Sequence, residues 1–278
     1  MVKCCDLHTH SHYSDGTAAP REIITRARDR GLGAVALTDH NTVAGLPEFL
    51  AAAEGSDLRA IPGIEISTGF EGRELHIVGL FLAPEVYGQV QDFVEVINIR
   101  KEASNRQLIA ALCDLGYDLD LDTLKAKHKG NINRAIIGAE MVEKGYLREI
   151  KEGFRSVLSA KHGVYVPPER ITATEAVAFL RSIGAVPVLA HPYLNLTQEG
   201  LDHFIEAAKP LGLAAMETRY STYTPETTEA AIRLAKEFGI MESGGSDFHG
   251  ENKPDIRLGI GRGDLRVPAM LMEKLLEA

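Results

Sequence analysis

The sequence predicts a parallel α/β barrel. Seven short segments rich in Val, Ile, Leu and Ala alternate with amphipathic segments, an order typical of parallel α/β folds. The length of 278 residues agrees with this fold, because a single α/β barrel needs roughly 250 residues. The predicted strands are residues 3–7, 33–38, 58–66, 75–82, 186–190, 213–217 and 240–243.

Helix signals lie between the predicted strands. Pro20 favours the first turn of a helix and Gly31 follows its end. Thr172 and Glu175 have the spacing of a capping box, in which each side chain binds the backbone N–H of the other residue. The expected helices cover residues 20–30, about 43–53, 172–183 and 224–238.

The alternation breaks between about residues 86 and 166. Val90, Val94 and Ile97 fall on one helical face, and a further helix is expected at 134–144. We interpret this segment as a helical insertion into the barrel. The expected domains are a metal-binding barrel of residues 1–85 and 167–278, and an inserted helical subdomain of residues 86–166 that caps the substrate.

Composition and charge exclude several classes of protein. No run of about 20 apolar residues is present, and the start carries Lys3 without an apolar signal core, so we expect no membrane association. Three cysteines without a CxxC pair favour a reduced, cytoplasmic protein. The net charge of −9 argues against stable binding to duplex DNA. Residues 100–170 carry a net charge of +3, and the rest of the chain carries −12. The positive segment suits an anionic ligand, although a solvated helical face explains its charge equally well. The negative remainder suits metal cations.

Polar side chains that can bind metals follow most of the predicted strands. In an α/β barrel the strand ends open onto one face, where active sites are built. Residues two apart in a strand share a side, so His8 and His10 point together, as do Asp247 and His249. The candidate ligands are His8, His10, Asp15, His40, Glu65, His76, His191, Asp247 and His249. Imidazole with carboxylate suits Zn, Mn or Fe, and the lack of cysteine argues against a structural zinc site.

Each of these residues alone has an ordinary explanation. A single His-x-His pair is more often a surface or core feature, and His76 alone would be a satisfied strand histidine. Asp39 either orients His40 or caps the following helix. Taken together, these residues favour metal binding over the ordinary explanations. Buried histidines are uncommon, and here strand after strand ends in one. The sequence therefore predicts a cluster of two or three divalent metal ions.

The motifs resemble those of the PHP (polymerase and histidinol phosphatase) superfamily in their order along the chain. They are His8-Thr9-His10, Ser14-Asp15-Gly16-Thr17, Thr38-Asp39-His40, Gly63-Ile64-Glu65, His76, Ala190-His191-Pro192 and Gly245-Ser246-Asp247-Phe248-His249. The Ser-Asp-Gly-Thr turn and the helical insertion are most similar to the stand-alone phosphoesterase branch. That branch includes nucleoside 3′,5′-bisphosphate phosphatases and 5′-to-3′ exoribonucleases.

The resemblance implies a distorted (β/α)₇ barrel and a division of the ligands among metals. His8, His10, Glu65 and Asp247 would hold one metal, and Asp15, His40 and His249 a second. His76 and His191, with Glu65 as a bridge, would hold a third. The implied cofactors are two or three divalent ions, Mn, Zn or Fe.

The implied activity is hydrolysis of phosphate esters in small nucleotides of the 3′,5′-bisphosphate type, or at the 5′ ends of short RNA. Metal ions lower the pKa of water from 15.7 to about 7 and so supply hydroxide at neutral pH. Asp15, His191 and Arg134 are the expected catalytic residues. Arg134, Arg148 and Arg219 are the expected substrate-binding residues, with Arg134 clamping a phosphate through its planar fork.

Three alternatives stay open. The insertion retains only Arg134 of the family's Arg-Pro-His pattern, which leaves the identity of the substrate open. Histidinol phosphate is the first alternative, although the Ser-Asp-Gly-Thr turn and the long insertion fit the other branch better. Amide hydrolysis is a second alternative, although no lysine follows a predicted strand as a metal ligand. A non-catalytic metal-binding regulatory domain is the third, and it would be expected to have lost ligands.

Overall fold

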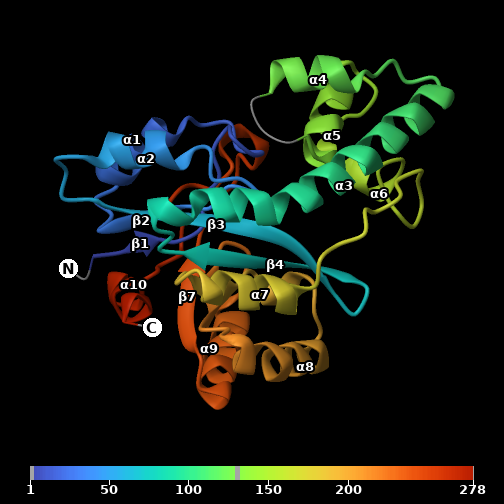
Figure 1. The fold of residues 1–278 in the computed structure, drawn as a ribbon. Coiled ribbons are helices and arrows are strands. Elements are labelled where there is room, and N and C mark those ends of the chain that lie inside the picture. Colours follow the sequence, from blue (N-terminus) through green and yellow to red (C-terminus); the bar gives the residue numbers. More distant parts are fainter. Residues whose placement is uncertain (1–2, 129–131, 278) are drawn as a thin grey trace.

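The seven strands form one sheet in sequence order, β1 to β7, which curls into a nearly closed barrel. The computed structural model describes residues 3–128 and 132–277 (Figure 1). The strands are β1 (Cys5–Asp6), β2 (Ala34–Leu37), β3 (Arg59–Phe70), β4 (Arg73–Leu80), β5 (Val186–Leu189), β6 (Ala215–Tyr220) and β7 (Met241–Gly245). The last strand meets the first through backbone bonds from Leu7 N to Gly244 O (3.2 Å) and from Asp247 N to His8 O (2.9 Å). The predicted α/β barrel of seven strands is confirmed.

One strand corrects the expectation of a wholly parallel sheet. β4 runs antiparallel to both β3 and β5. Glu71 and Gly72 form the two-residue turn between β3 and β4, with φ of 48° and 75°. Positive φ at both positions is typical of the tight hairpin turns whose twist suits paired strands. Because β4 is reversed, its first residues lie at the edge where the parallel strands end, and His76 reaches that edge.

Helices cover the outside of the barrel, and one helix closes its far end. Val35 and Leu37 of β2 face outward into the helical layer, whereas Ala34 and Ala36 face inward. Leu275 of the C-terminal helix packs in the same inner cluster. The covering helices are α1 (Pro20–Asp29), α2 (Leu46–Ala53), α7 (Ala173–Ser182), α8 (Gln198–Ala208) and α9 (Pro225–Phe238), and the C-terminal helix is α10 (Ala269–Leu276). Short 3₁₀ turns lie at Pro84–Val86, Pro192–Leu194, Lys209–Leu211 and Gly250–Asn252.

The inserted segment has its own small core but shares a helix with the barrel. Its helices are α3 (Tyr87–Asp114), α4 (Leu121–Lys127), α5 (Arg134–Glu143) and α6 (Ile150–Arg155). Val90 and Val94 in the first half of α3 pack on the barrel's outer layer, whereas Leu108 and Leu112 in its second half pack with Ile137. Figure 1 shows α3 running from the sheet out to α4, α5 and α6. One continuous helix therefore positions the insertion over the barrel.

None of the helices within residues 3–128 and 132–277 combines the length and the apolar character needed to cross a membrane.

Candidate metal centre

Glu65 lies at the centre of the histidines that follow the strands. Its Oε2 is 3.1 Å from Nε2 of both His8 and His10, and 3.2 Å from Nδ1 of His40. Its Oε1 is 2.8 Å from Nδ1 of His76 and bonds Nε2 of His191 at 2.9 Å. A second carboxylate of this region, Asp247, places Oδ1 3.2 Å from His10 Nε2. One buried carboxylate therefore contacts five imidazoles from four separate places in the chain.

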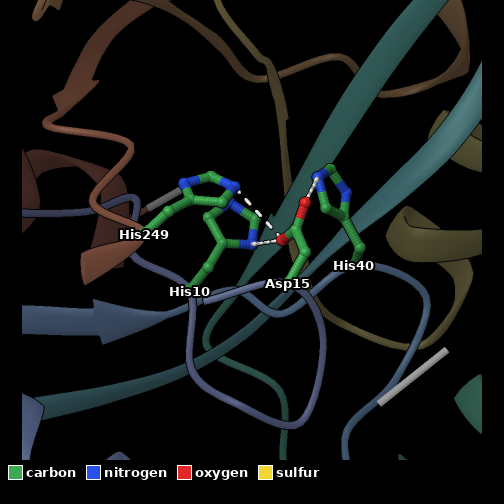
Figure 2. Close-up of side chains that lie close together, drawn as sticks. All are labelled: His10, Asp15, His40 and His249. Carbon is green, nitrogen blue, oxygen red and sulfur yellow. Dashed lines mark ion pairs between the residues drawn. The ribbon is translucent and has the colours of Figure 1, made fainter. Parts of the chain in front are cut away.

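Asp15 forms a second centre beside the first. Figure 2 shows the carboxylate of Asp15 between His10 and His249 on one side and His40 on the other. Its Oδ1 lies 3.1 Å from Nε2 of His249 and 3.8 Å from Nδ1 of His10, and its Oδ2 lies 3.9 Å from Nε2 of His40. His10 and His40 thus stand between Asp15 and Glu65, and each could serve either centre.

Within the described residues, three groups of side chains bring ligand atoms within 4.8 Å of one another. These groups are His8, His10, Glu65 and Asp247; His10, Asp15, His40 and His249; and His40, Glu65 and His76. The structure brings all nine predicted ligands into one region. His191 joins the third group through its bond to Glu65.

Several buried polar atoms of this region have no hydrogen-bond partner within the described part of the chain, and their arrangement suits a bound cation better than hydrogen bonds among themselves. Among the residues that the structure describes, His40 Nδ1, Glu65 Oε2 and His191 Nδ1 are buried without a hydrogen-bond partner. His40 Nδ1 and Glu65 Oε2 lie only 3.2 Å apart, but their geometry is not that of a hydrogen bond. Burial lowers the pKa of His10, yet the neighbouring carboxylates of Asp247 and Glu65 raise that pKa to about 9. Carboxylates that hold protons on imidazoles would hold a metal cation in the same place.

Two candidate ligands adopt backbone conformations that L-residues rarely take. His191 has φ of 31° and Asp247 has φ of 55°, both in the left-handed region. Such conformations cost of order 1–3 kcal/mol and persist where the surroundings fix them, often at functional sites. Gly245 is required nearby, because a side-chain carbon there would collide with Cβ of His8. The backbone after β5 and after β7 is thus shaped to place the side chains of His191 and Asp247, at some cost in stability.

A cavity of about 350 Å³ opens onto these ligands. The barrel contributes Asp15, His40, Glu65, His76 and His191 to its lining, together with Arg170 and Lys253, and the insertion contributes Lys101 and Arg134. The barrel wall therefore carries carboxylates and imidazoles, and its two cations are paired with Glu74 and Asp247, whereas the insertion wall adds two further cations.

The family model of the PHP domain matches residues 6–240. The chain belongs to the PHP family. A 5′-3′ exoribonuclease of Haemophilus influenzae is 31% identical over 250 residues, 90% of this chain and 91% of that protein. A 3′,5′-nucleoside bisphosphate phosphatase of Chromobacterium violaceum is 28% identical, with 90% of each chain covered. The solved structure of a candidate metal-dependent phosphoesterase from Bifidobacterium adolescentis gives a TM-score of 0.86 at 26% identity, covering 99% of this chain and 96% of that chain.

In this PHP chain, buried acidic residues behind the ligands fix the loops that carry them. Asp6 accepts bonds from Ser246 N (2.8 Å) and Gly259 N (2.7 Å), and Asp39 accepts bonds from Ser11 N and Ser14 Oγ (both 2.7 Å). Burial raises the pKa of the Asp6 and Asp39 carboxyls, and these bonds oppose that rise. Asp39 therefore fixes the loop that leads to Asp15.

Sequence reasoning missed three residues that contact the ligands directly. Glu217 bonds His8 Nδ1 at 2.8 Å, and Tyr220 donates to Asp247 Oδ2 at 2.6 Å. Lys253 also donates to Asp247 Oδ2, at 2.6 Å. Glu217 could have been found, because it ends a predicted strand in the same way as the other polar residues. Tyr220 and Lys253 lie in no recognisable pattern.

The three predicted substrate-binding arginines lie in different places. Arg134 lines the cavity, with its guanidinium 4.0 Å above the ring of Tyr165. Arg148 is exposed and lies outside the lining of the cavity. Arg219 lines a separate cavity and pairs with Glu242. The structure therefore brings only one of the three to the metal centre.

A β-bulge explains the position of Arg219. The register of β6 against β7 shifts between Glu217 and Arg219. In a regular strand these two residues would share a face, but the extra residue turns Arg219 away and brings Tyr220 to the side of Glu217. The sequence does not signal this bulge.

Proposed function

We propose that the chain is a metal-dependent phosphoesterase that hydrolyses a phosphate ester of a small nucleotide, or the 5′ end of a short RNA. The observation that carries the proposal is the pairing of two walls in one cavity. The barrel wall offers ligand atoms that converge around Glu65 and Asp15, and the insertion offers cations that a phosphate would bind. The named activities of the exoribonuclease and the bisphosphate phosphatase are consistent with this substrate class.

The proposal assigns two or three divalent ions, Mn, Zn or Fe, to the three ligand groups. Bound divalent ions lower the pKa of water from 15.7 to about 7 and draw charge from phosphoryl oxygens. His8, His10, Glu65 and Asp247 would hold one ion, and Asp15, His40 and His249 another. His76 and His191, bridged by Glu65, would hold a third.

The insertion wall would bind the phosphate groups. Arg134 rests on Tyr165 and lies 3.8 Å from Glu74, so its planar fork is oriented before substrate arrives. The side chain of Lys101 makes no ion pair or hydrogen bond with any residue that the structure describes, and it lines the same cavity. A substrate with two phosphates could place one at the metal centre and the other against these cations.

Asn133 joins the two walls. Its side-chain oxygen accepts a bond from Ile136 N at 2.9 Å and so caps α5, while its amide nitrogen donates to Asp15 Oδ2 at 2.8 Å. The insertion is thereby held directly against the second ligand group. We infer that Asp15 acts where the substrate's reacting phosphate meets the metals.

The test measures phosphate release from a nucleoside 3′,5′-bisphosphate, a short 5′-phosphorylated RNA and histidinol phosphate, each with Mn²⁺ and with chelator. We expect manganese-dependent hydrolysis of the bisphosphate or the RNA that His191→Ala abolishes. His203→Ala is the matched control, because His203 is exposed on α8 and lies outside the lining of the cavity. Hydrolysis of histidinol phosphate alone would replace the proposed substrate class. No hydrolysis of any of the three by metal-loaded protein would contradict the proposal.

A further inference from the structure

Glu217 of β6 contacts two candidate ligands that lie far apart in the sequence. Its Oε1 bonds Nδ1 of His8 at 2.8 Å, and its Oε2 accepts the backbone N–H of His191 at 2.6 Å. Glu217 is 1% exposed, so no water competes for either hydrogen bond. One side chain therefore fixes a ligand of the first proposed metal and a ligand of the third.

The first bond determines which nitrogen of His8 faces the metals. An anionic carboxylate accepts hydrogen bonds, so Nδ1 of His8 carries a hydrogen and donates it to Glu217. Nε2 then presents its lone pair toward Glu65 Oε2, 3.1 Å away, which is the arrangement a metal ligand needs.

The second bond stabilises the backbone of His191. Its left-handed conformation, with φ of 31°, is costly for a residue with a side chain. The short bond from its N–H to Glu217 offsets this cost and aims Nε2 at Glu65 Oε1, 2.9 Å away. The β-bulge after Glu217 directs Tyr220, which bonds Asp247, into the same site.

We propose that Glu217 is a positioning residue that couples two metal sites, by fixing the tautomer of His8 and the backbone of His191 with its two oxygens. This inference rests on the proposed metal-dependent function. Glu217 itself is not part of the lining of the cavity. It therefore acts on metal affinity and leaves substrate binding unchanged.

The decisive variant is Glu217→Gln, which keeps the size of the side chain but replaces one acceptor oxygen with a donor. If the amide NH₂ of the new side chain faces His191, it meets the backbone N–H of His191, and two donors then face each other without an acceptor. If it faces His8, Nδ1 must accept, and the ring hydrogen moves to Nε2, where it blocks metal binding. We expect metal affinity to fall about 10- to 100-fold by calorimetric titration of the metal-free protein with Mn²⁺ and Zn²⁺.

Two further readouts separate positioning from a general structural role. The metal-free variant should still fold and should melt only a few degrees below wild type, because a single buried hydrogen bond is lost. Saturating Mn²⁺ should restore much of kcat while KM stays unchanged throughout. Glu242→Gln is the matched control, because Glu242 lies on the neighbouring β7 and pairs with Arg219 outside the metal centre. That control should bind metals with wild-type affinity.

Unchanged metal affinity in Glu217→Gln would overturn the proposal. If that variant does not fold, Glu217→Asp is titrated instead, since its shorter carboxylate keeps the charge but cannot reach both partners; wild-type affinity there would overturn the proposal equally. The titration needs no substrate. A protein that binds metals but hydrolyses none of the tested esters would contradict the proposed function and still decide the role of Glu217.

Discussion

The two walls of the cavity differ in how firmly their side chains are held. On the barrel wall, His8, His10 and Glu65 are fully buried and each contacts several others. On the insertion wall, Lys101 has no ion pair with any described residue, and the side chain of Arg134 is 24% exposed. The side chains of the barrel wall are therefore fixed by one another, whereas on the insertion wall Arg134 is oriented by Tyr165 and Glu74 and Lys101 has no ion-pair partner among the described residues. We infer that the chemistry belongs to the barrel and the choice of substrate to the insertion.

The largest effect should come from the centre of the barrel wall. Glu65→Gln removes the carboxylate shared by five imidazoles, so we expect kcat/KM to fall at least about 100-fold, beyond the loss seen for residues behind metal ligands. Metal at 100 times its Kd should stabilise wild type by about 2.7 kcal/mol, and this gain should vanish in the variant. Phosphate release and thermal melting with Mn²⁺ and with chelator measure both effects.

Glu48→Gln is the control for this prediction, because Glu48 lies on the outer helix α2 and pairs with Arg21, away from the cavity. Metal-dependent stabilisation that persisted in Glu65→Gln would show that the barrel wall is not the metal site.

The contrast between the walls also explains what could be predicted from the sequence. Barrel ligands follow strands, and strand ends share one face, so the nine candidates could be named without coordinates. His76 was placed correctly although its strand was assigned the wrong direction. The reversed β4 depends on a two-residue turn at Glu71 and Gly72, and Glu71 is not a residue typical of such turns.

Residues of the insertion could not be placed in the same way. A cation on a helix can face solvent or a cavity, and the choice depends on how α3 and α5 lie over the barrel. The sequence favours Arg134 over Arg148 only through its match to the family's insertion motif, and of the two only Arg134 lines the cavity. Lys101 was missed because no local pattern distinguishes it from the other cations of α3. Arg219 was misplaced because a one-residue bulge decides its face.

Substitution of Arg134 on the insertion wall should have an effect on kinetics that is smaller than that of Glu65→Gln. Arg134→Ala should raise KM about 10- to 100-fold and change kcat less, because it removes a charged hydrogen-bond donor to the phosphate and leaves the metals in place. Arg134→Lys should recover only part of this loss, since lysine lacks the planar fork. Steady-state kinetics at saturating Mn²⁺ measure both variants.

The exposed Arg148 provides the control for Arg134, because Arg148→Ala removes the same charge from the same subdomain outside the cavity. A KM of Arg134→Ala no higher than that of Arg148→Ala would remove Arg134 from the substrate site. It would also weaken the inference that the barrel carries out the chemistry and the insertion selects the substrate.

The smallest effect, and the sharpest test of that division, should come from Lys101. Its ammonium group is a single point charge, so Lys101→Met should raise KM only about 2- to 5-fold. Burial lowers the pKa of Lys101, and the carboxylates of Asp15 and Glu74 oppose this shift. The ammonium group therefore loses its charge at a lower pH than an exposed lysine. KM should rise with pH in wild type as this charge is lost, and it should rise less in Lys101→Arg, which stays charged.

The same shift sets the sign of the effect on stability. Because the pKa of Lys101 is lower in the folded than in the unfolded protein, the unfolded chain binds more protons between the two values, and stability rises with pH across that window. Below the folded pKa the full cost of burying the charge is present. Lys101→Met should therefore melt no lower than wild type at pH 7 while binding substrate more weakly. A variant that melts lower with unchanged KM would show that Lys101 supports the fold and not the substrate.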